Sequence, residues 1–397
     1  KARERLTAGT TDFRTRGGLC AGKGAMPGRL AFVFPGEGAQ YAGMLSDLAV
    51  AYPGVRDWLD FLDSTFGDSR DYRPSEAMLP PPTGLANGQR ERLEQALFDM
   101  DLASESVFTA SQALYGLLQD VGVRPALMVG HSTGENSALV ASNTVRASDR
   151  EDLAGISRAL NAIYRDLEAD GQIHSGSLLT VGALNAEARA AALGETADAL
   201  TLAMDNCPNQ AVYFGTREDI AKAHEQLSAA GGICSELPFG RAYHTHWFAP
   251  VEAAFRAFYA ELDMGPGDVP LYSCSTATPF PTEPDAIRDT ACGQWSRRVR
   301  FVETIERLYE DGVRVFVGAE TELGTDGRVR LEPSRVEIEE LLVALVAPVL
   351  LAVVLLGRGG AGDDVRERSG DVVQQARHMA IVGVVHDRGA RESPGMH

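Results

Sequence analysis

Disulfide and metal motifs are missing from this sequence. Its five cysteines form no C-x-x-C pair; they are Cys20, Cys207, Cys234, Cys274 and Cys292. The eight histidines include no H-E-x-x-H motif. We therefore expect neither a disulfide framework nor a bound metal. Scattered, reduced thiols are typical of a cytoplasmic protein, and the cytoplasm is the location that we expect.

Positive charge is scarce as well. The chain carries 37 Lys and Arg residues against 55 Asp and Glu residues, a formal net charge of −18. Such an excess of negative charge argues against non-specific binding of nucleic acid, because the phosphates are repelled. The rest of the composition, 44% hydrophobic and 23% charged, is ordinary for a globular protein, and 397 residues can form about two or three domains.

Long apolar runs are also rare. The stretch Leu341–Leu356 is uncharged, but it is interrupted by Pro348 and is shorter than the roughly 20 residues that a membrane helix needs. We expect it to be a buried hydrophobic run, and we expect no membrane partner. The chain starts at Lys1 without an initiator Met or a signal-like segment, which predicts that it is cut from a longer polypeptide.

The most informative stretch of the sequence surrounds Ser132. A short apolar run, 126–129, predicts a buried strand, and 130–134 (GHSTG) fits the G-x-S-x-G pattern of a nucleophile elbow. Residues 135–140 then predict a helix whose N-terminal dipole favours negative charge at the turn. The alternative is a simple Gly-Ser turn in which Ser132 or Thr133 caps the helix.

The remaining elements predict an α/β protein. The run 30–34 (LAFVF) is a strand that leads into a glycine turn at 35–40. Later strands are expected at 178–181, 200–204, 211–214, 234–237, 270–273 and 313–317, and helices at 41–70, 93–118, 154–167, 185–193, 217–229, 252–258 and 299–309. The middle group has the order β-α-β-β-α-β, which is typical of a ferredoxin-like subdomain.

This order predicts a division of the chain into parts. We expect a linker at 1–29, the first part of a large α/β subdomain at 30–168, a ferredoxin-like small subdomain at 169–239, the second part of the large subdomain at 240–318 and an atypical tail at 319–397. For the tail two interpretations stay open. It is either a sequence artefact such as a shifted reading frame, or a genuine, divergent and disordered linker.

Four pieces of the sequence together indicate a known family. They are FPGEGAQ at 34–40, GHSTGE at 130–135, Arg158, and Tyr243-His244 followed by Pro250. The combination resembles the malonyl-CoA:acyl-carrier-protein transacylase family, which includes the acyltransferase domains of polyketide and fatty acid synthases, over about residues 30–318. The wording FPGEGAQ, GHSTGEN and RAYHT is most similar to domains of iterative type I synthases of the enediyne kind, which serve antibiotic biosynthesis.

The resemblance implies a fold, an activity and partners. The fold would be a large hydrolase-like α/β subdomain with a parallel core sheet and an inserted ferredoxin-like subdomain. The activity would be that of an acyltransferase that moves malonyl from malonyl-CoA to the thiol of a phosphopantetheinyl carrier protein through an ester on Ser132, with no cofactor bound by the domain itself. Its partners would be malonyl-CoA, an acyl carrier protein domain and a neighbouring ketosynthase domain of the same chain.

A serine nucleophile needs a base, and histidine is the usual one. His131 is adjacent to Ser132, but neighbouring elbow residues point apart, so we interpret it as a packing residue. The resemblance makes His244 the base, with His246 as the competing assignment. It also implies that a backbone carbonyl near Arg300 orients the histidine, with a solvated helix charge as the equal alternative for that arginine.

The tetrahedral intermediate of acyl transfer needs backbone N–H donors. The resemblance assigns them to Glu37 and Thr133. The wider family usually has Gln at position 37, but Glu is compatible because the donor is the main chain. Gln40 is expected to be structural.

The resemblance also implies how the acyl group is selected. Arg158 would hold the free carboxylate of malonyl as a bidentate fork, which requires one extra residue in the loop 143–151; Arg165 is the alternative. An aromatic ring just before the histidine goes with malonyl, so Tyr243 is expected to fill the space of an α-methyl group. The alternative is that Tyr243 packs in the subdomain interface.

Two other functions compete with acyl transfer. A serine esterase or thioesterase with the same elbow could use Asp205 as the third member of a triad. The FPGEGAQ turn and an arginine in the acyl pocket both speak against it. A non-catalytic docking domain is disfavoured because Ser132 and His244 are both intact.

Overall fold

A computed structural model of the protein describes residues 28–237 and 240–318. It also describes four short strands, which are β1 (Phe13–Arg14), β2 (Cys20–Ala21), β13 (Ala344–Leu345) and β14 (Ile381–Val384). Most of the predicted linker and of the predicted tail, including nearly all of the apolar run 341–356, therefore lies outside the described residues. Within the described residues, no helix is both long enough and apolar enough to cross a bilayer.

The larger sheet has a parallel centre, as the sequence predicts. Its order is β10-β9-β4-β3-β12-β14-β13, and the parallel members are β3 (Arg29–Phe34), β4 (Leu127–Gly130), β9 (Leu271–Ser273) and β12 (Val313–Gly318). The strand β10 (Thr278–Pro279) runs antiparallel to β9, and β14 runs antiparallel to β12. Both faces of β3 and β4 are buried, which is why both strands are continuous apolar runs.

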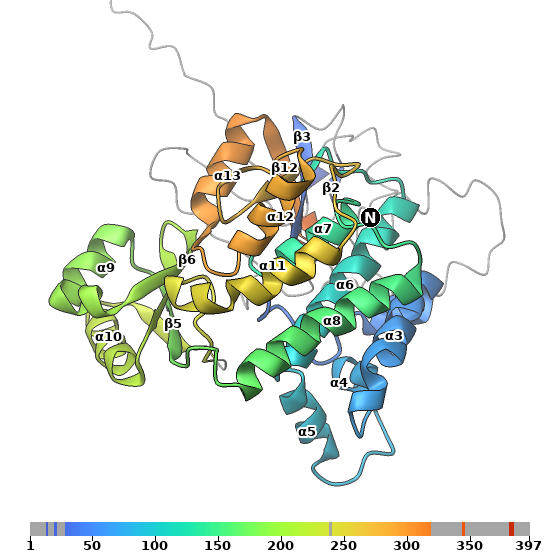
Figure 1. Ribbon diagram of the computed structural model, residues 1–397, viewed down its shortest axis with the longest axis horizontal. Helices are drawn as coiled ribbons and strands as arrows, with labels where there is room; N and C mark the ends of the chain where they lie inside the picture. Colours follow the sequence, from blue (N-terminus) through green and yellow to red (C-terminus); the bar gives the residue numbers. More distant parts are fainter. Residues whose placement is uncertain are drawn as a thin grey trace, which may run out of the picture.

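Alternate residues of the two central strands contribute to two different hydrophobic clusters, as the two-residue period of a strand requires. One cluster contains Phe32, Phe34 and Met128, and the other contains Ala31, Val33, Leu127 and Val129. Helices cover both faces of the sheet, and Figure 1 shows α13 on one side of the strands β3 and β12 and α6 and α8 on the other. The turns that follow β3 and β4 therefore stand on a buried support.

The helices of the large part are mostly short. They are α2 (Ser46–Ala51), α3 (Pro53–Phe66), α4 (Pro74–Met78), α5 (Gln89–Ala96), α6 (Met100–Asp120), α7 (Gly134–Ala141), α8 (Arg150–Ala169), α11 (Glu252–Glu261), α12 (Pro284–Gly293) and α13 (Phe301–Glu310). The described residues also form 3₁₀ turns. In the large part these are η1 (Gly67–Ser69) and η3 (His246–Val251), and in the small part η2 (Gly194–Ala199).

The smaller sheet has the ferredoxin-like arrangement that the sequence predicts. Its chain order is β5 (Ser177–Gly182), α9 (Ala186–Leu193), β6 (Thr201–Cys207), β7 (Gln210–Gly215), α10 (Arg217–Ala229) and β8 (Ile233–Glu236). The four strands are antiparallel in the order β6-β7-β5-β8. In Figure 1 this yellow-green part projects from the side of the larger one. The domain boundaries at 168 and 239 remain predictions.

Some local expectations differ from the structure. The expected helix at 41–70 is divided into α2, α3 and η1, with Tyr52 extended between the first two. The expected helix at 93–118 is divided between α5 and α6, with Asp99 extended at the junction.

The stretch 299–309 begins as a two-residue strand, β11 (Val299–Arg300), that joins the small sheet beside β6 before α13 starts. The helix α12 lies between the expected strand 270–273 and the expected helix 299–309, where the sequence predicted no element. It begins at a proline, whose fixed φ suits a first helical position, and it is amphipathic.

Candidate active site

The turn between β4 and α7 holds Ser132 in a strained conformation. Its φ is 53°, in the left-handed region that residues other than glycine rarely adopt. The residues at positions 130 and 134 must be glycine, because a side chain there would overlap neighbouring backbone atoms. A Cβ on Gly130 would lie 2.2 Å from the amide nitrogen of Glu135, and one on Gly134 would lie 2.3 Å from the carbonyl oxygen of Phe34. The G-x-S-x-G spacing therefore lets the end of β3, the turn and α7 pack directly together.

The hydroxyl of Ser132 contacts the imidazole of His244. The Oγ–Nε2 distance is 2.6 Å. On the other side of the ring, Nδ1–H donates to the carbonyl oxygen of Gln294 at 2.9 Å. Because a carbonyl can only accept, Nδ1 carries the proton and Nε2 is free to accept one from the serine. This is the arrangement that a base needs to activate a hydroxyl nucleophile.

The orienting carbonyl comes from a different place than the sequence suggested. It belongs to Gln294, directly after α12, and not to the neighbourhood of Arg300, which donates instead to Glu303 and to the carbonyl of Thr276. Gln294 is itself held by α7, because its Nε2 donates to Oδ1 of Asn136 at 3.1 Å. The helix that follows the serine therefore also fixes the partner of the histidine.

Burial sets the charge state of the base. His244 is 2% exposed. Removal from water lowers the pKa of His244 to about 4, against the opposing effect of the Gln294 carbonyl. The ring is therefore neutral at pH 7, which is the state that can accept the serine proton.

The other two candidate histidines do not reach the serine. The Nε2 of His131 lies 2.7 Å from Oδ1 of Asn206, and its ring stands edge-on to Phe301. The predicted packing role of His131 is confirmed. His246 is exposed at the start of η3 and packs on the ring of Trp247.

The glycine turn after β3 lies against the elbow. A Cβ on Gly36 would lie 2.7 Å from the carbonyl oxygen of His131, so only glycine fits this contact. The next residue, Glu37, donates its backbone N–H to Oγ1 of Thr133 at 3.2 Å. The structure thus brings together the two main-chain segments that the sequence assigned to the oxyanion hole. The Gln40 side chain accepts from the backbone N–H of Gly38 at 2.8 Å and braces this turn.

Arg158 lies on α8, its contacts within the described residues do not include the serine, and its assignment to the acyl carboxylate remains a prediction. Its side chain is 45% exposed and pairs with Glu151 at 2.9 Å. The preceding residue, Ser157, faces inward and lines a cavity next to the elbow. Successive helical residues point about 100° apart, so one position decides whether a side chain of α8 faces the site or solvent. Arg165, the alternative, is exposed as well.

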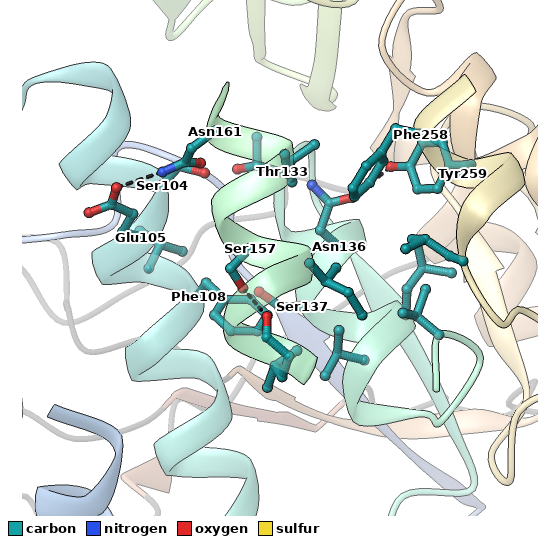
Figure 2. A pocket seen from close by; sticks show the side chains of 18 of the residues that line it. Ser104, Glu105, Phe108, Thr133, Asn136, Ser137, Ser157, Asn161, Phe258 and Tyr259 are labelled. Carbon is teal, nitrogen blue, oxygen red and sulfur yellow. Dashed lines mark hydrogen bonds between the residues drawn. The ribbon is translucent and has the colours of Figure 1, made fainter. Parts of the chain in front are cut away.

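The cavity itself lies between α6, α7, α8 and α11 and is mainly apolar (Figure 2). Thr133 and Asn136 border it on the side of the elbow. Its lining residues include neither arginine nor lysine. At its polar end, Asn161 donates to Glu105 at 2.6 Å, as Figure 2 shows.

A buried arginine that the sequence reasoning missed lies close to the base. Arg241 is 7% exposed, and its guanidinium donates to the hydroxyl of Tyr243 at 3.1 Å. It also lies 5.7 Å from the centre of the Tyr164 ring and interacts electrostatically with Glu37. The only sequence signal was a charge within the mostly apolar run around the RAYH motif.

Tyr243 is packed in an aromatic cluster next to the base. It is 4% exposed, and its ring centre lies 5.0 Å from that of Phe248 and 6.2 Å from that of His244. Burial raises the pKa of Tyr243 far above its usual value, so the hydroxyl stays protonated. Whether the ring also limits the acyl group remains a prediction.

The elbow also contains a buried acid. Glu135 is 1% exposed and accepts hydrogen bonds from the Ser273 hydroxyl and from the backbone N–H of Cys274. Burial raises the pKa of Glu135 to about 8, and these two hydrogen bonds oppose the rise. The carboxyl group is therefore largely neutral at pH 7 and ties α7 to the end of β9.

The geometry does not provide a third triad member. Asp205, on β6, lies 3.9 Å from the guanidinium of Arg189. The position on Nδ1 of His244 that a triad acid would take is held by the carbonyl of Gln294. The triad that an esterase would build with Asp205 is therefore not formed.

Comparison with known proteins identifies relatives of this arrangement. A family model described as "Acyl transferase domain" matches residues 31–320. The chain is 29% identical over 381 residues to the spectinabilin polyketide synthase system protein NorA' of Streptomyces orinoci, covering 94% of this chain and 9% of that protein. It is 28% identical to the malonyl CoA-acyl carrier protein transacylase of Escherichia coli strain K12, covering 72% of this chain and 89% of that one.

A similar solved structure is that of PlMCAT with AntF, a type II polyketide synthase acyl-carrier protein in complex with its malonyl-transacylase. The TM-score is 0.60 at 25% identity, with 72% of this chain and 86% of that chain covered. The chain thus spans about a tenth of the length of its polyketide synthase relative and most of the length of the transacylases.

Proposed function

Because the chain belongs to the acyl transferase domain family, we propose that it moves malonyl from malonyl-CoA to the thiol of an acyl carrier protein through an ester on Ser132. The observation that supports this most directly is the 2.6 Å contact between Ser132 Oγ and His244 Nε2, with the Gln294 carbonyl on the far side of the ring. This contact places an activated hydroxyl in the elbow, and the proteins similar to this chain include transacylases.

The first half-reaction forms the ester. His244 Nε2 takes the Ser132 proton as Oγ attacks the thioester carbonyl, which breaks the carbonyl π bond and leaves an oxyanion. The backbone N–H groups of Glu37 and Thr133 stabilise that oxyanion. The Glu37 N–H, which donates to the Thr133 hydroxyl in the free protein, then donates to the oxyanion instead. When the intermediate collapses, the C–S bond breaks and the CoA sulfur takes the proton from His244.

The second half-reaction is the reverse with a new thiol. The phosphopantetheine thiol of the carrier protein gives its proton to His244 and attacks the ester carbonyl. The C–O bond to Ser132 then breaks, and the serine recovers its proton from the histidine. The neutral resting state of His244 suits both steps, because the ring must accept a proton first each time.

Hydrolysis is the second candidate and is less well supported. It would need water to compete with the carrier thiol, and the triad that it would draw on is absent, since Asp205 lies by Arg189. The family match also belongs to acyl transferases.

We further propose the setting of this activity. The chain covers 9% of a polyketide synthase relative, which fits an acyltransferase domain inside a longer synthase with a ketosynthase domain nearby. The wording FPGEGAQ, GHSTGEN and RAYHT supports an iterative, enediyne-type synthase of antibiotic biosynthesis. The scattered cysteines without a C-x-x-C pair support a location in the cytoplasm.

The test is incubation with malonyl-CoA followed by peptide mass spectrometry and then addition of a phosphopantetheinylated carrier protein. We expect one malonyl group on the peptide that contains Ser132, which then moves to the carrier thiol faster than it appears as free malonate. Release mainly as malonate would favour the hydrolase, and a label on another residue would contradict the ester on Ser132.

A further inference from the structure

We propose that the side-chain amide of Asn136 donates a hydrogen bond to the free carboxylate of the acyl group while that group is bound at Ser132. The inference deepens the proposed function and rests on it, because it assumes a donor that carries a carboxylate, as malonyl does. It gives a specificity-determining role to a residue that neither the sequence motifs nor the family match assigns one. The contact adds to a counter-charge on α8, such as Arg158, because a carboxylate has two oxygens that can each accept.

The Asn136 amide is held in one orientation. Its Oδ1 accepts a hydrogen bond from Nε2 of Gln294 at 3.1 Å and another from the Tyr259 hydroxyl at 3.1 Å. The two donors come from different parts of the fold, one directly after α12 and one from α11. A turn of the amide by half a rotation would present Nδ2 to both donors, so the oxygen stays on their side and Nδ2 on the other. A side chain fixed in this way loses little conformational freedom when it binds a ligand.

The nitrogen of this amide lies beside the cavity next to the elbow. Thr133 and Asn136 both line that cavity. In Figure 2 the Asn136 side chain lies between Thr133 and Tyr259, with its nitrogen toward Thr133. Among the residues that the structure describes, Oδ1 makes the two hydrogen bonds above and Nδ2 makes none. Its N–H groups are therefore available to an acceptor that enters the cavity.

The spacing along α7 suits the malonyl group. Thr133, whose backbone N–H is assigned to the oxyanion, is the N-cap of α7, and Asn136 lies three residues further on. Three residues rise about 4.5 Å along a helix axis and share a face of the helix. The carboxylate of malonyl is separated from its thioester carbonyl by one carbon atom. When the carbonyl oxygen is bound at Thr133, the carboxylate therefore comes within hydrogen-bonding reach of the next turn.

The other end of the cavity is less suitable for a carboxylate. There Asn161 donates to Glu105 at 2.6 Å, and Glu105 is paired with Arg70 at 3.0 Å. The hydroxyl of Ser157 donates to a backbone carbonyl of its own helix at 2.9 Å. A second carboxylate beside Glu105 would be repelled, because like charges in a buried site disfavour each other. The elbow end, with the N–H groups of Asn136, offers a hydrogen bond instead.

Asn136→Asp separates the two roles of this side chain. Aspartate keeps an oxygen that accepts from Gln294 and Tyr259, but it replaces the N–H donors with an oxygen that repels a carboxylate. The initial rate of ester formation on Ser132 is measured by intact mass with malonyl-CoA and with acetyl-CoA, at about pH 8, where the new carboxyl is ionised. We expect malonyl loading to slow by about 100-fold or more and acetyl loading by less than about fivefold.

The matched control is Asn185→Asp, which makes the same substitution and the same change of net charge in the small part. Asn185 is the N-cap of α9, and its side chain accepts from the backbone N–H of Ala188 at 2.8 Å. Aspartate caps a helix about as well as asparagine, so both loading rates should equal those of wild type. A matching loss of malonyl loading in this control would overturn the inference, because net charge would then explain the effect.

The outcomes separate this inference from the proposed function. Wild type that forms no malonyl ester on Ser132 overturns the proposed function and this inference with it. Wild type that loads malonyl, together with an unchanged ratio of malonyl to acetyl loading in Asn136→Asp, overturns only the inference. Equal losses for both donors also overturn it, because Asn136 would then act only through Gln294 on the base.

A second variant guards against loss of folding. Asn136→Ala removes the amide without adding a charge, and thermal melts followed by circular dichroism show which variants are folded. If Asn136→Asp unfolds, Asn136→Ala decides. Both loading rates should then fall, because Gln294 loses its hydrogen bond to α7, and malonyl loading should fall by a further factor of about 10–100. A ratio of malonyl to acetyl loading equal to that of wild type would overturn the inference.

Discussion

Ser132 and His244, 112 residues apart in the chain, both have left-handed backbone conformations and meet side chain to side chain at 2.6 Å. Their φ angles are 53° and 60°. Residues other than glycine adopt this region at a cost of about 1–3 kcal/mol, which the surrounding structure must offset. At the serine this is done by the close contact of β3, the elbow and α7, and at the histidine by the two hydrogen bonds to Gln294 and Trp295.

Removing either side chain should stop the first half-reaction. Ser132→Ala is expected to abolish ester formation, because no other hydroxyl contacts His244 in the described structure. His244→Ala should slow it by roughly 10²–10⁴-fold, the usual effect of a lost general base. Intact-mass measurement of malonyl incorporation tests both, with His246→Ala as the matched control. If His246→Ala is the more damaging histidine change, the base has been assigned wrongly.

The rate of ester formation should stay constant to unusually low pH. Burial lowers the pKa of His244 to about 4, so the ring remains a neutral base until the pH falls below about 5. In the unfolded chain the pKa of His244 has its ordinary value, so the unfolded chain binds a proton at a higher pH than the folded protein does. Between roughly pH 6.5 and 4, stability should therefore also decrease as pH falls.

The measurement is kcat/KM for acetyl loading from pH 4 to 8, with circular dichroism at each pH to verify folding. Acetyl is chosen because the titration of Glu37 near pH 7 should affect malonyl binding more. An acidic limb centred near 6.5 in folded protein would contradict the buried, neutral base.

Glu135→Gln should stabilise the protein more at pH 8 than at pH 5. Burial raises the pKa of Glu135 to about 8, so the folded state holds a proton that the unfolded state releases above about pH 4.5. Folding then takes up a proton, and stability falls as pH rises through this window, by up to about 1.4 kcal/mol per pH unit. An uncharged glutamine removes this dependence. Urea denaturation of wild type and Glu135→Gln at the two pH values measures their free energies of unfolding. If the two proteins differ by the same free energy at pH 5 and pH 8, Glu135 is ionised in the folded state.

Gly134→Ala should unfold or strongly destabilise the protein. The added methyl would lie 2.3 Å from the Phe34 carbonyl oxygen and 2.4 Å from that of Pro35. Both are backbone atoms, one at the last residue of β3 and one directly after it, so they cannot move as a side chain can. We expect a loss of at least about 3 kcal/mol, at the upper end for overpacking.

The matched control is Gly116→Ala, in the C-terminal part of α6. Nothing lies within 4 Å of a Cβ at that position. Alanine there should raise stability by about 0.5–1 kcal/mol, because it restricts the unfolded chain. Thermal melts compare the two variants, and similar melting temperatures would show that the elbow tolerates a side chain at 134.

The sequence was informative where local chemistry determines local structure. The elbow was predictable because its geometry is encoded in a short motif. The serine has a left-handed backbone conformation, and no side chain fits at the glycines on either side of it. The ferredoxin-like order was predictable because each of its strands is a short apolar run between helical stretches. In both cases the signal lies within a few neighbouring residues.

The parts that the sequence left open depend on helix phase and on the main chain. Arg158 and Ser157 are adjacent, yet only Ser157 lines the cavity, and the direction of a side chain on α8 cannot be read from the loop that precedes the helix. The Gln294 carbonyl carries no side-chain signature at all. Its position follows from α12, a helix that the sequence analysis did not predict.

The last prediction concerns the space beside the acyl α-carbon. Tyr243 precedes the base, and its ring centre lies 6.2 Å from that of His244. The ring is fixed on several sides, by Phe248, Tyr164 and the hydrogen bond from Arg241, so it cannot easily swing away from a larger acyl group. If it borders the acyl site, one extra methyl group should be disfavoured by about 1–3 kcal/mol, or roughly 10–200-fold.

We therefore expect wild type to prefer malonyl-CoA to methylmalonyl-CoA and Tyr243→Ser to narrow that preference. A competition assay with both thioesters measures the ratio of the two esters on Ser132. Tyr243→Phe is the matched control, because it keeps the ring and removes only the hydroxyl that Arg241 contacts. Its preference should stay close to that of wild type. An unchanged ratio in Tyr243→Ser would mean that the ring only packs against its aromatic neighbours and that the α-methyl group is excluded elsewhere.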